Sequence, residues 1–328
     1  MEKYKVLYTD TGMGDVSIER DVLAKADAAL VLASAIDEET LIFEGMDCDG
    51  VMIEYAEITS RILDAWGKGG RVKVIGRQGI GVNNIDLEAA NRNRIMVANV
   101  PDYCLDEVAD HTVALALNIL REIKSFGKRV ENYDFQEHSL RPMIRLKGRN
   151  FCVYGFGNIA KRVVKRAQAF GFNAYTFDPF ASQEELKEYN TTRINSLEEL
   201  ASMADVFSIH VPLLESTKHS VNKNIFKRMK TNCVVINTAR GSLINENDLI
   251  EALKGNTISG AGLDVFEQEP PDFSNPLLYM DNVVVTQHIS WCSEEAEAEL
   301  RMRLAENMVL TFTTGQPRGF VNREAFKK

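Results

Sequence analysis

Short apolar runs alternate with amphipathic segments along most of this chain. Between residues 150 and 290 we predict six strands from such runs: Phe151 to Tyr154, Asn173 to Phe177, Val206 to Ile209, Cys233 to Ile236, Ser259 to Leu263 and Val283 to Thr286. Apolar runs separated by helical patterns are typical of strands buried on both faces of a parallel sheet. This half of the chain therefore predicts a doubly wound α/β unit.

The first hundred residues repeat the pattern. Helical periodicity at Glu57 to Trp66 and Leu87 to Arg92 falls between predicted strands. We expect these strands at Lys5 to Thr9, Ala29 to Ala33, Gly50 to Glu54, Val72 to Ile75 and Ile95 to Asn99. Such alternation predicts a second α/β unit, of flavodoxin-like type.

Two further helices lie outside these series. Asp106 to about Glu131 reads as one long helix whose apolar positions exceed a single stripe, which is typical of a helix covered on two sides. We expect it to support a subunit interface as well as the core. Glu294 to Leu310 reads as a charged amphipathic helix, and we expect it to cross back to the first unit, which would make that unit discontinuous.

Composition narrows the class of protein. Lys and Arg number 38 against 47 Asp and Glu, a net charge of -9, so we expect neither nucleic acid nor an anionic membrane as a partner. The chain begins as a strand rather than a signal peptide, and no apolar stretch approaches the roughly 20 residues that span a bilayer. The five scattered cysteines contain no CxxC pair, which favours reduced thiols and no metal site. A soluble cytoplasmic protein is the expectation.

One glycine-rich segment carries the cofactor signal. Gly155-Phe156-Gly157-Asn158-Ile159-Ala160 fits GxGxxG/A, follows a predicted strand and opens a predicted helix. The first glycine permits a tight turn, the second lets the backbone approach a pyrophosphate, and the small third residue lets the helix pack close to the strand. The earlier Gly79-Ile80-Gly81 lacks a small residue at the third position and is read as a turn that can touch ligand.

An acidic residue completes the motif. The next predicted strand ends at Asp178, 23 positions after Gly155 and near the spacing of the carboxylate that binds the adenosine ribose hydroxyls. A carboxylate there would repel a 2'-phosphate. The sequence therefore favours NAD(H) over NADP(H).

Hydride transfer to a ketone requires a positioned acid, and histidine fits near neutral pH. His288 ends the last predicted strand, where parallel strands gather their ligand-binding residues. His210 ends another strand, followed by Val211-Pro212, where main chain could line the cofactor. His138 and His219 are expected at the surface, and His111 is expected to be structural.

Two more side chains complete a catalytic constellation. Glu269 lies in the loop after the fifth strand, and a carboxylate beside His288 would favour the imidazolium and fix its tautomer. Arg240 follows the fourth strand, and a guanidinium can bind the carboxylate of a 2-oxo acid through two oxygens. The trio predicts an oxidoreductase acting on small 2-oxo or 2-hydroxy acids, although oxidation of phosphite stays open.

The chain resembles the D-isomer-specific 2-hydroxyacid dehydrogenase family over essentially its whole length. The likeness rests on the segments at 155–160, 237–241 (NTARG), 262–270 (GLDVFEQEP) and 286–291 (TQHISW). It implies two Rossmann/flavodoxin-like parallel-sheet domains, with the NAD-binding domain, residues 101–295, inserted in a discontinuous substrate domain, residues 1–100 plus 296–328. It also implies a homodimer formed through the cofactor domains.

The resemblance assigns roles residue by residue. Arg240 would bind substrate, His288 would exchange the proton, and Glu269 would tune His288. Asp264 would hold the nicotinamide carboxamide. The candidate cofactor-binding residues are Ile80, Gly155, Phe156, Gly157, Asn158, Ile159, Asp178, Pro179, His210, Val211, Pro212, Thr217, Thr238, Ala239, Arg240, Asp264 and His288. The candidate substrate-binding residues are Tyr55, Ala56, Gly79, Arg240, His288 and Trp291.

Within the family, segments 99–104, 107–111 and 288–294 look most like the branch of the C-terminal-binding proteins, which are NAD-sensing corepressors. A non-catalytic NAD(H)-sensing scaffold is therefore the alternative function. Segment 211–217 is closer to the metabolic dehydrogenases. Trp291 could wall the substrate pocket or pack at the start of the last helix, and Tyr55 could be only a strand-end aromatic.

Overall fold

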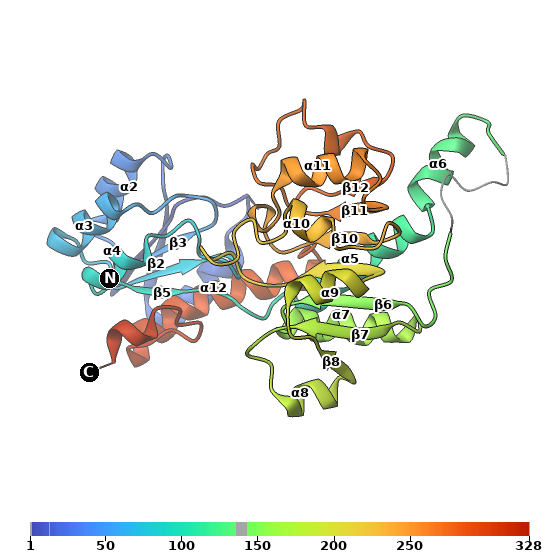
Figure 1. Ribbon diagram of the computed structural model, residues 1–328. Coiled ribbons are helices and arrows are strands. Elements are labelled where there is room, and N and C mark those ends of the chain that lie inside the picture. Colours follow the sequence, from blue (N-terminus) through green and yellow to red (C-terminus); the bar gives the residue numbers. More distant parts are fainter. Residues whose placement is uncertain (1, 13, 136–142, 328) are drawn as a thin grey trace. The chain divides into compact units, whose positions relative to one another are not determined.

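The computed structural model describes residues 2–12, 14–135 and 143–327, which divide into two compact units. Unit 1 comprises Met1–Tyr103 and Ser293–Lys328, and unit 2 comprises Cys104–Cys292. Each unit contains one sheet, and every strand pair in both sheets is parallel (Figure 1). The predicted fold class, two parallel α/β units with one inserted in the other, is confirmed.

Unit 1 has the strand order β2-β1-β3-β4-β5, which confirms the flavodoxin-like prediction. Its strands are β1 Tyr4–Tyr8, β2 Ala28–Leu32, β3 Gly50–Ile53, β4 Val74–Arg77 and β5 Met96–Ala98. Its helices are α1 Ser17–Leu23, η1 Ala24–Ala26, α2 Glu38–Gly45, α3 Ser60–Gly69, α4 Leu87–Arg92, α12 Glu294–Thr314 and η4 Arg323–Phe326.

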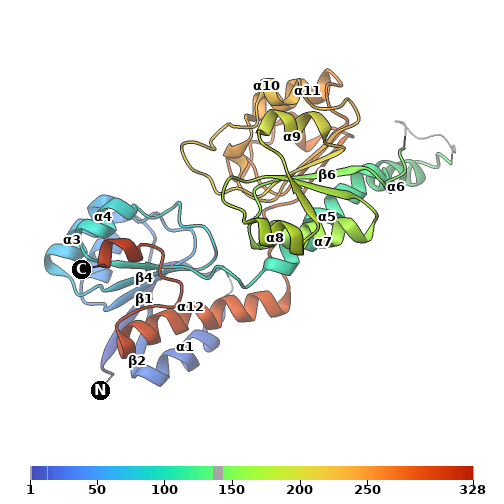
Figure 2. The ribbon, with the colours of Figure 1, turned by 60° about the horizontal axis from the view of Figure 1, so that its bottom comes forward.

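The last long helix belongs to unit 1, as predicted. Ser293 caps α12 by accepting from the Ala296 amide at 2.9 Å, and α12 lies beside α1 (Figure 2). Two contacts explain the docking. Buried Arg301 donates to both carboxylate oxygens of Glu19 on α1, at 2.8 and 2.9 Å. Glycines at positions 50 and 76 of the sheet leave room for Met308, whose side chain a Cβ at either site would approach within 2.8 Å.

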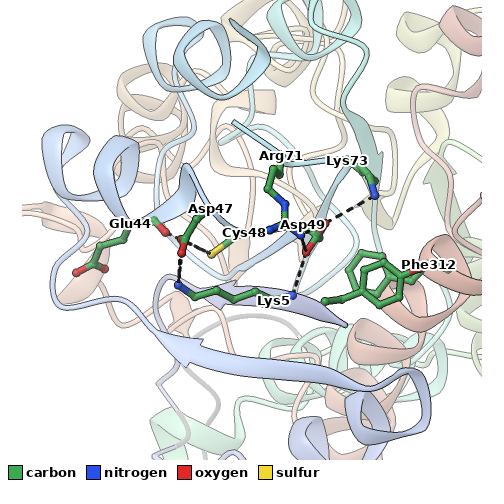
Figure 3. Close-up of polar contacts among 9 residues, drawn as sticks. Lys5, Glu44, Asp47, Cys48, Asp49, Arg71, Lys73 and Phe312 are labelled. Atoms are coloured by element: carbon green, nitrogen blue, oxygen red, sulfur yellow. Dashed lines mark hydrogen bonds and ion pairs between the residues drawn. The ribbon is translucent and has the colours of Figure 1, made fainter. Parts of the chain in front are cut away.

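A buried aspartate organises the amino edge of this sheet (Figure 3). Asp49 accepts from the Lys5 amide at 3.1 Å and from Arg71 at 2.8 Å, and its side chain is 3% exposed. Unit 2 repeats the arrangement, because Asp205 precedes β9 and accepts from the Asn150 amide at 2.9 Å. Each acid satisfies an amide at the amino end of a neighbouring strand, the second amide of β1 and the first amide of β6, which would otherwise lack a partner in the sheet.

Unit 2 has the order β12-β11-β10-β9-β6-β7-β8, and the order in which successive strands are added to the sheet reverses between β6 and β9. Its strands are β6 Asn150–Tyr154, β7 Asn173–Phe177, β8 Thr191–Arg193, β9 Val206–Ile209, β10 Val234–Asn237, β11 Gly260–Leu263 and β12 Val283–Val285. Its helices are α5 Leu105–Leu120, α6 Ile123–Glu131, α7 Asn158–Ala169, α8 Gln183–Glu188, α9 Leu197–Met203, α10 Lys223–Phe226, η2 Gly241–Leu243, α11 Glu246–Lys254 and η3 Pro276–Leu278.

The six strands predicted for unit 2 are present, but one further strand was not predicted and one expectation was wrong. A seventh strand, β8, is present although its sequence is polar, because an edge strand needs only one buried side. The single long helix is two helices, since Glu122 adopts φ 53° and ends the α5 ladder before α6 begins. Left-handed backbone interrupts helical hydrogen bonding at that point.

Candidate active site

The glycine-rich turn connects β6 to α7 at the switch point of the unit 2 sheet, where doubly wound sheets bind ligands. Gly155 has φ +93°, and a Cβ there would lie 3.0 Å from the His210 main chain. A Cβ on Gly157 would meet no described protein atom within 4 Å. Ala160 is fully buried. Protein atoms therefore pack against the first and third small residues of the motif, Gly155 and Ala160. The space beside the second, Gly157, is open to a ligand, as a pyrophosphate site requires.

Asp178 lies just past β7, as predicted, and its carboxylate also braces the turn. One oxygen accepts from the Phe156 amide at 2.7 Å and the other from the Phe180 amide at 2.8 Å. Pro179 beside it is exposed. Since a carboxylate oxygen can accept more than one hydrogen bond, Asp178 keeps capacity for ribose hydroxyls.

The loop after β9 lies against the glycine-rich turn. His210 pairs with the Ser208 hydroxyl at 2.8 Å, and burial lowers the pKa of His210 to about 3. The imidazole is therefore neutral at physiological pH and is unsuited to be the acid. Thr217 closes the following segment by donating to the Pro212 carbonyl at 2.7 Å.

The decisive contact joins two residues predicted to act together. His288 Nδ1 lies 2.7 Å from Glu269 Oε2, and the other oxygen, Oε1, accepts from the Phe266 amide at 2.9 Å. Burial raises the pKa of Glu269, but the bond to His288 and the positive charges of His288 and Arg240 outweigh it and leave the pKa below its usual value. The carboxylate is thus ionised beside the imidazole.

Arg240 lies near the Glu269–His288 pair and comes from the adjoining strand. It follows β10, and Asn237 shapes the turn by donating to the Arg240 carbonyl at 2.8 Å. A Cβ on Gly241 would lie 1.9 Å from the Phe266 backbone, so only glycine lets this turn pack against the loop that carries Glu269. The structure therefore brings the predicted trio together within unit 2.

Asp264 holds the His288 loop from beneath. Its side chain is fully buried and accepts from Thr286 Oγ1 at 2.6 Å, from the Ile289 amide at 2.9 Å and from the Ser290 amide at 3.0 Å. The Asp264 carbonyl accepts from the His288 amide at 2.7 Å. These bonds stabilise His288 at φ 55°, a left-handed conformation that non-glycine residues rarely adopt.

His111, which was expected to be structural, belongs to this network, although its partner was not predicted. His111 on α5 lies 3.0 Å from Thr286 Oγ1 and 3.9 Å from Asp264. Thr112 beside it bonds Thr238 at 2.8 Å, next to Ala239. The signal in the sequence was a His-Thr pair next to the apolar stretch 113–117 of this helix. His219, expected at the surface, has a side chain that is 38% exposed and pairs with Glu267 at 3.1 Å. His138 lies outside the described residues.

The predicted substrate residues of unit 1 follow the carboxyl ends of its strands. Asp10 accepts from the amides of Glu54, Tyr55 and Ala56. Tyr55 is 70% exposed, whereas Ala56 is buried. Gly79 begins the turn after β4 with φ +137°. Within the described chain, the amides of Ile80 and Gly81 donate to no protein acceptor.

Residues 113–290 match the family model of the D-isomer specific 2-hydroxyacid dehydrogenase, NAD binding domain. The chain belongs to this family. Hydroxypyruvate reductase of Thermotoga maritima is 36% identical over 255 residues, 77% of this chain and 80% of that protein. D-3-phosphoglycerate dehydrogenase of Methanocaldococcus jannaschii is 38% identical over 290 residues, 85% of this chain.

Against the phosphoglycerate dehydrogenases the chain spans about half of the relative's length, 55% for the protein of M. jannaschii. Among solved structures, D-lactate dehydrogenase from Aquifex aeolicus complexed with NAD and lactic acid has a TM-score of 0.84 and 26% identity, covering 96% of this chain and 99% of that one. The predicted family and its NAD-binding domain are confirmed. The likeness to the C-terminal-binding-protein branch, and with it the role of half-buried Trp291, stays a prediction.

Neither a membrane-spanning helix nor a metal site is found among the described residues. None of the helices described combines the length and the apolar composition that crossing a bilayer needs. Across residues 2–12, 14–135 and 143–327, no group of three or more His, Cys, Asp and Glu side chains is arranged as metal ligands.

Proposed function

We propose that this protein is an NAD-dependent oxidoreductase that interconverts small 2-oxo acids and (R)-2-hydroxy acids. The contact between His288 Nδ1 and Glu269 Oε2 carries the proposal, because it leaves Nε2 as the nitrogen available to a substrate. An NAD-sensing scaffold would need no such acid. The alternative is therefore not favoured.

In this proposal each side chain has a separate task. Arg240 binds the substrate carboxylate and polarises the ketone, while His288, oriented by Glu269, donates a proton to the oxygen as it gains charge. Trp291 walls the pocket. Nicotinamide, when bound, supplies or accepts the hydride.

The cofactor residues follow the same logic. The Gly155 to Ile159 turn and the α7 amino terminus would hold the pyrophosphate, and Asp178 with Pro179 the ribose. The segment from His210 to Pro212 with Thr217, and the segment from Thr238 to Ala239, would line the cofactor with Ile80. Asp264 braces the His288 loop and would bond the carboxamide through its remaining capacity.

Substrate binding in unit 1 is assigned to the turn that begins at Gly79. Because Asp10 uses the amides of Tyr55 and Ala56, the amides of Ile80 and Gly81 are better placed to donate to a carboxylate. Tyr55 would then contact the substrate through its exposed ring.

The deciding experiment is NADH oxidation by the purified protein against a panel of 2-oxo acids, with chiral analysis of the products. We expect turnover that yields (R)-2-hydroxy acids, and loss of turnover in His288→Ala with NADH binding retained. NADH binding by the wild type without oxidation in any member of the panel would contradict the proposal and favour the scaffold.

We also propose a homodimer formed through unit 2 and a cytoplasmic location. Helix α6 exposes Ile123 at 57% and Val130 at 52% of their surfaces, and apolar surface of this kind favours association. None of the five cysteines, all of which lie in the described residues, forms a disulfide, as a reducing compartment would keep them.

A further inference from the structure

Two glutamates join the loop that carries Glu269 to helix α11 by bonding each other's main chain. Glu267 Oε1 accepts from the Glu246 amide at 2.8 Å, and Glu246 Oε2 accepts from the Glu267 amide at 3.2 Å. Glu246 is the first residue of α11, where a free helical amide favours a carboxylate acceptor. This reciprocal pair, Glu246 and Glu267, lies wholly within unit 2. It fixes the loop to the helix at two points.

Two further side chains donate to the carboxylates of the reciprocal pair. Asn275 Nδ2 donates to Glu246 Oε1 at 2.7 Å. His219 Nε2 lies 3.1 Å from Glu267 Oε1, and because a carboxylate oxygen accepts, Nε2 is the donor in this contact. Three segments of the chain therefore hold the two acids in one arrangement, although the side chain of Glu267 is 34% exposed.

Phe266 connects the reciprocal pair to the proposed proton donor. The peptide group that follows Phe266 is held by Glu246, through the amide of Glu267. The amide of Phe266 itself donates to Glu269 Oε1 at 2.9 Å, and the opposite oxygen of Glu269 lies 2.7 Å from His288 Nδ1. Rotation of the 266–267 peptide would move the chain that leads to Glu269. It would therefore change how Glu269 meets His288.

The turn after Arg240 packs on the same peptide. A Cβ on Gly241 would lie 1.9 Å from the Phe266 carbonyl carbon and 2.4 Å from the Glu267 nitrogen. Gly241 begins η2, which leads into α11. The 266–267 peptide is thus packed against the turn that follows Arg240 and hydrogen-bonded to the helix that comes next.

We propose that the reciprocal pair positions Glu269 for its contact with His288, which makes Glu246 and Glu267 positioning residues of the active site. They act through the 266–267 peptide and not through contact with the substrate. The proposal rests on the proposed function, since it assigns residues to the reaction of the same site.

Two substitutions at position 267 separate positioning from charge. Glu267→Ala removes the acceptor of the Glu246 amide, whereas Glu267→Gln keeps an oxygen that can accept from that amide and from His219. With NADH and hydroxypyruvate, Glu267→Ala should lower kcat by roughly tenfold and change the Kd for NADH by less than about twofold, because the acid is misplaced but the cofactor site is not. Glu267→Gln should keep kcat close to that of wild type. Glu251→Gln, at a carboxylate of α11 that is 78% exposed, is the matched control and should change neither quantity.

A double-mutant cycle tests whether Glu267 acts through Glu269. In a Glu269→Gln background, Glu267→Ala should lower kcat by less than about twofold, because no carboxylate remains to be positioned. A full loss in both backgrounds, or equal losses in Glu267→Ala and Glu267→Gln, would overturn the positioning role and leave the proposed function standing.

Glu246→Ala provides a second, independent variant, since it removes the acceptor of the Glu267 amide from the other side of the pair. It should show the same loss of kcat with NADH affinity retained, and thermal unfolding shows that each variant is folded. Wild-type kcat in both alanine variants would overturn the positioning role alone. A wild type that binds NADH but reduces neither hydroxypyruvate nor any other 2-oxo acid would overturn both proposals.

Discussion

His288 Nδ1 and Glu269 Oε2 lie 2.7 Å apart although 19 positions separate the two residues in the chain. Each is held by its own support. Asp264 fixes the His288 loop through main-chain and side-chain bonds, and the Phe266 amide holds the opposite oxygen of Glu269. The pair therefore forms before any substrate arrives, which is how an acid is pre-organised for proton transfer.

Replacing Glu269 should affect both rate and stability. Glu269→Gln should lower kcat for 2-oxo acid reduction by about 10- to 100-fold while NADH affinity stays constant, because the imidazolium loses its partner. The pKa of Glu269 is lowered in the folded state, so its contribution to stability is present above the ordinary value of 4.5 and is lost as pH falls below it. Urea unfolding should show a difference from wild type at pH 7 that shrinks below pH 4.5. A difference that does not vary with pH would contradict this.

The lowered pKa of His210 also predicts a loss of folding stability as pH falls, but over a different pH range from that of Glu269. Its pKa is about 3 in the folded protein and ordinarily 6.5, so below pH 6.5 the unfolded chain binds the proton more readily. Stability should fall by up to about 1.4 kcal/mol per pH unit from this group as pH drops from 6.5 towards 3. His210→Gln can keep the bond to Ser208 and should flatten that part of the curve. If wild type and His210→Gln lost unfolding free energy equally with falling pH, as measured by urea unfolding, the role given to His210 would be wrong.

Among the residues that support the His288 loop, Asp264 should cause the largest loss of stability and turnover when it is replaced. Asp264→Asn places an amide group where three donors converge, so we expect a loss of about 2–3 kcal/mol in unfolding free energy and a large loss of turnover. Thr286→Val removes one of those donors and should cost only about 1 kcal/mol. Calorimetry and steady-state kinetics on both variants test the order. Equal costs would show that the carboxylate does not organise the loop.

Substitutions at two glycines should have different effects, one on cofactor binding and the other on folding stability. Gly157→Ala adds a Cβ that meets no described protein atom, so thermal stability should stay close to wild type while NADH affinity falls by roughly tenfold or more, because the backbone can no longer approach the pyrophosphate. Gly241→Ala drives a Cβ into the Phe266 backbone and should cost about 1–3 kcal/mol. NADH fluorescence titration and thermal unfolding distinguish them. Unchanged NADH affinity in Gly157→Ala would refute the placement of the pyrophosphate.

The proposed dimer has its own test. Ile123→Asp and Val130→Asp add charge to the exposed apolar positions of α6, so light scattering should show a monomer in place of a dimer. Glu131→Gln, at an exposed position of the same helix, alters charge without touching an apolar position and serves as the control. A monomeric wild type would exclude the homodimer.

Local sequence patterns were enough to predict the two parallel sheets, the glycine-rich turn, Asp178 and the strand-end positions of Arg240, Glu269 and His288. These features are local, since strand periodicity and turn chemistry are set by neighbouring residues, and parallel strands necessarily gather their carboxyl ends. Polar β8 gave no such signal, and the break at Glu122 depends on one left-handed residue inside an apolar pattern. Two relationships could be seen only in the folded chain: His111 contacts Thr286, and Asp10, Glu54 and Arg77 share one edge of a sheet. These residues lie from 23 to 175 positions apart, and no local pattern encodes the side-chain directions that bring them together.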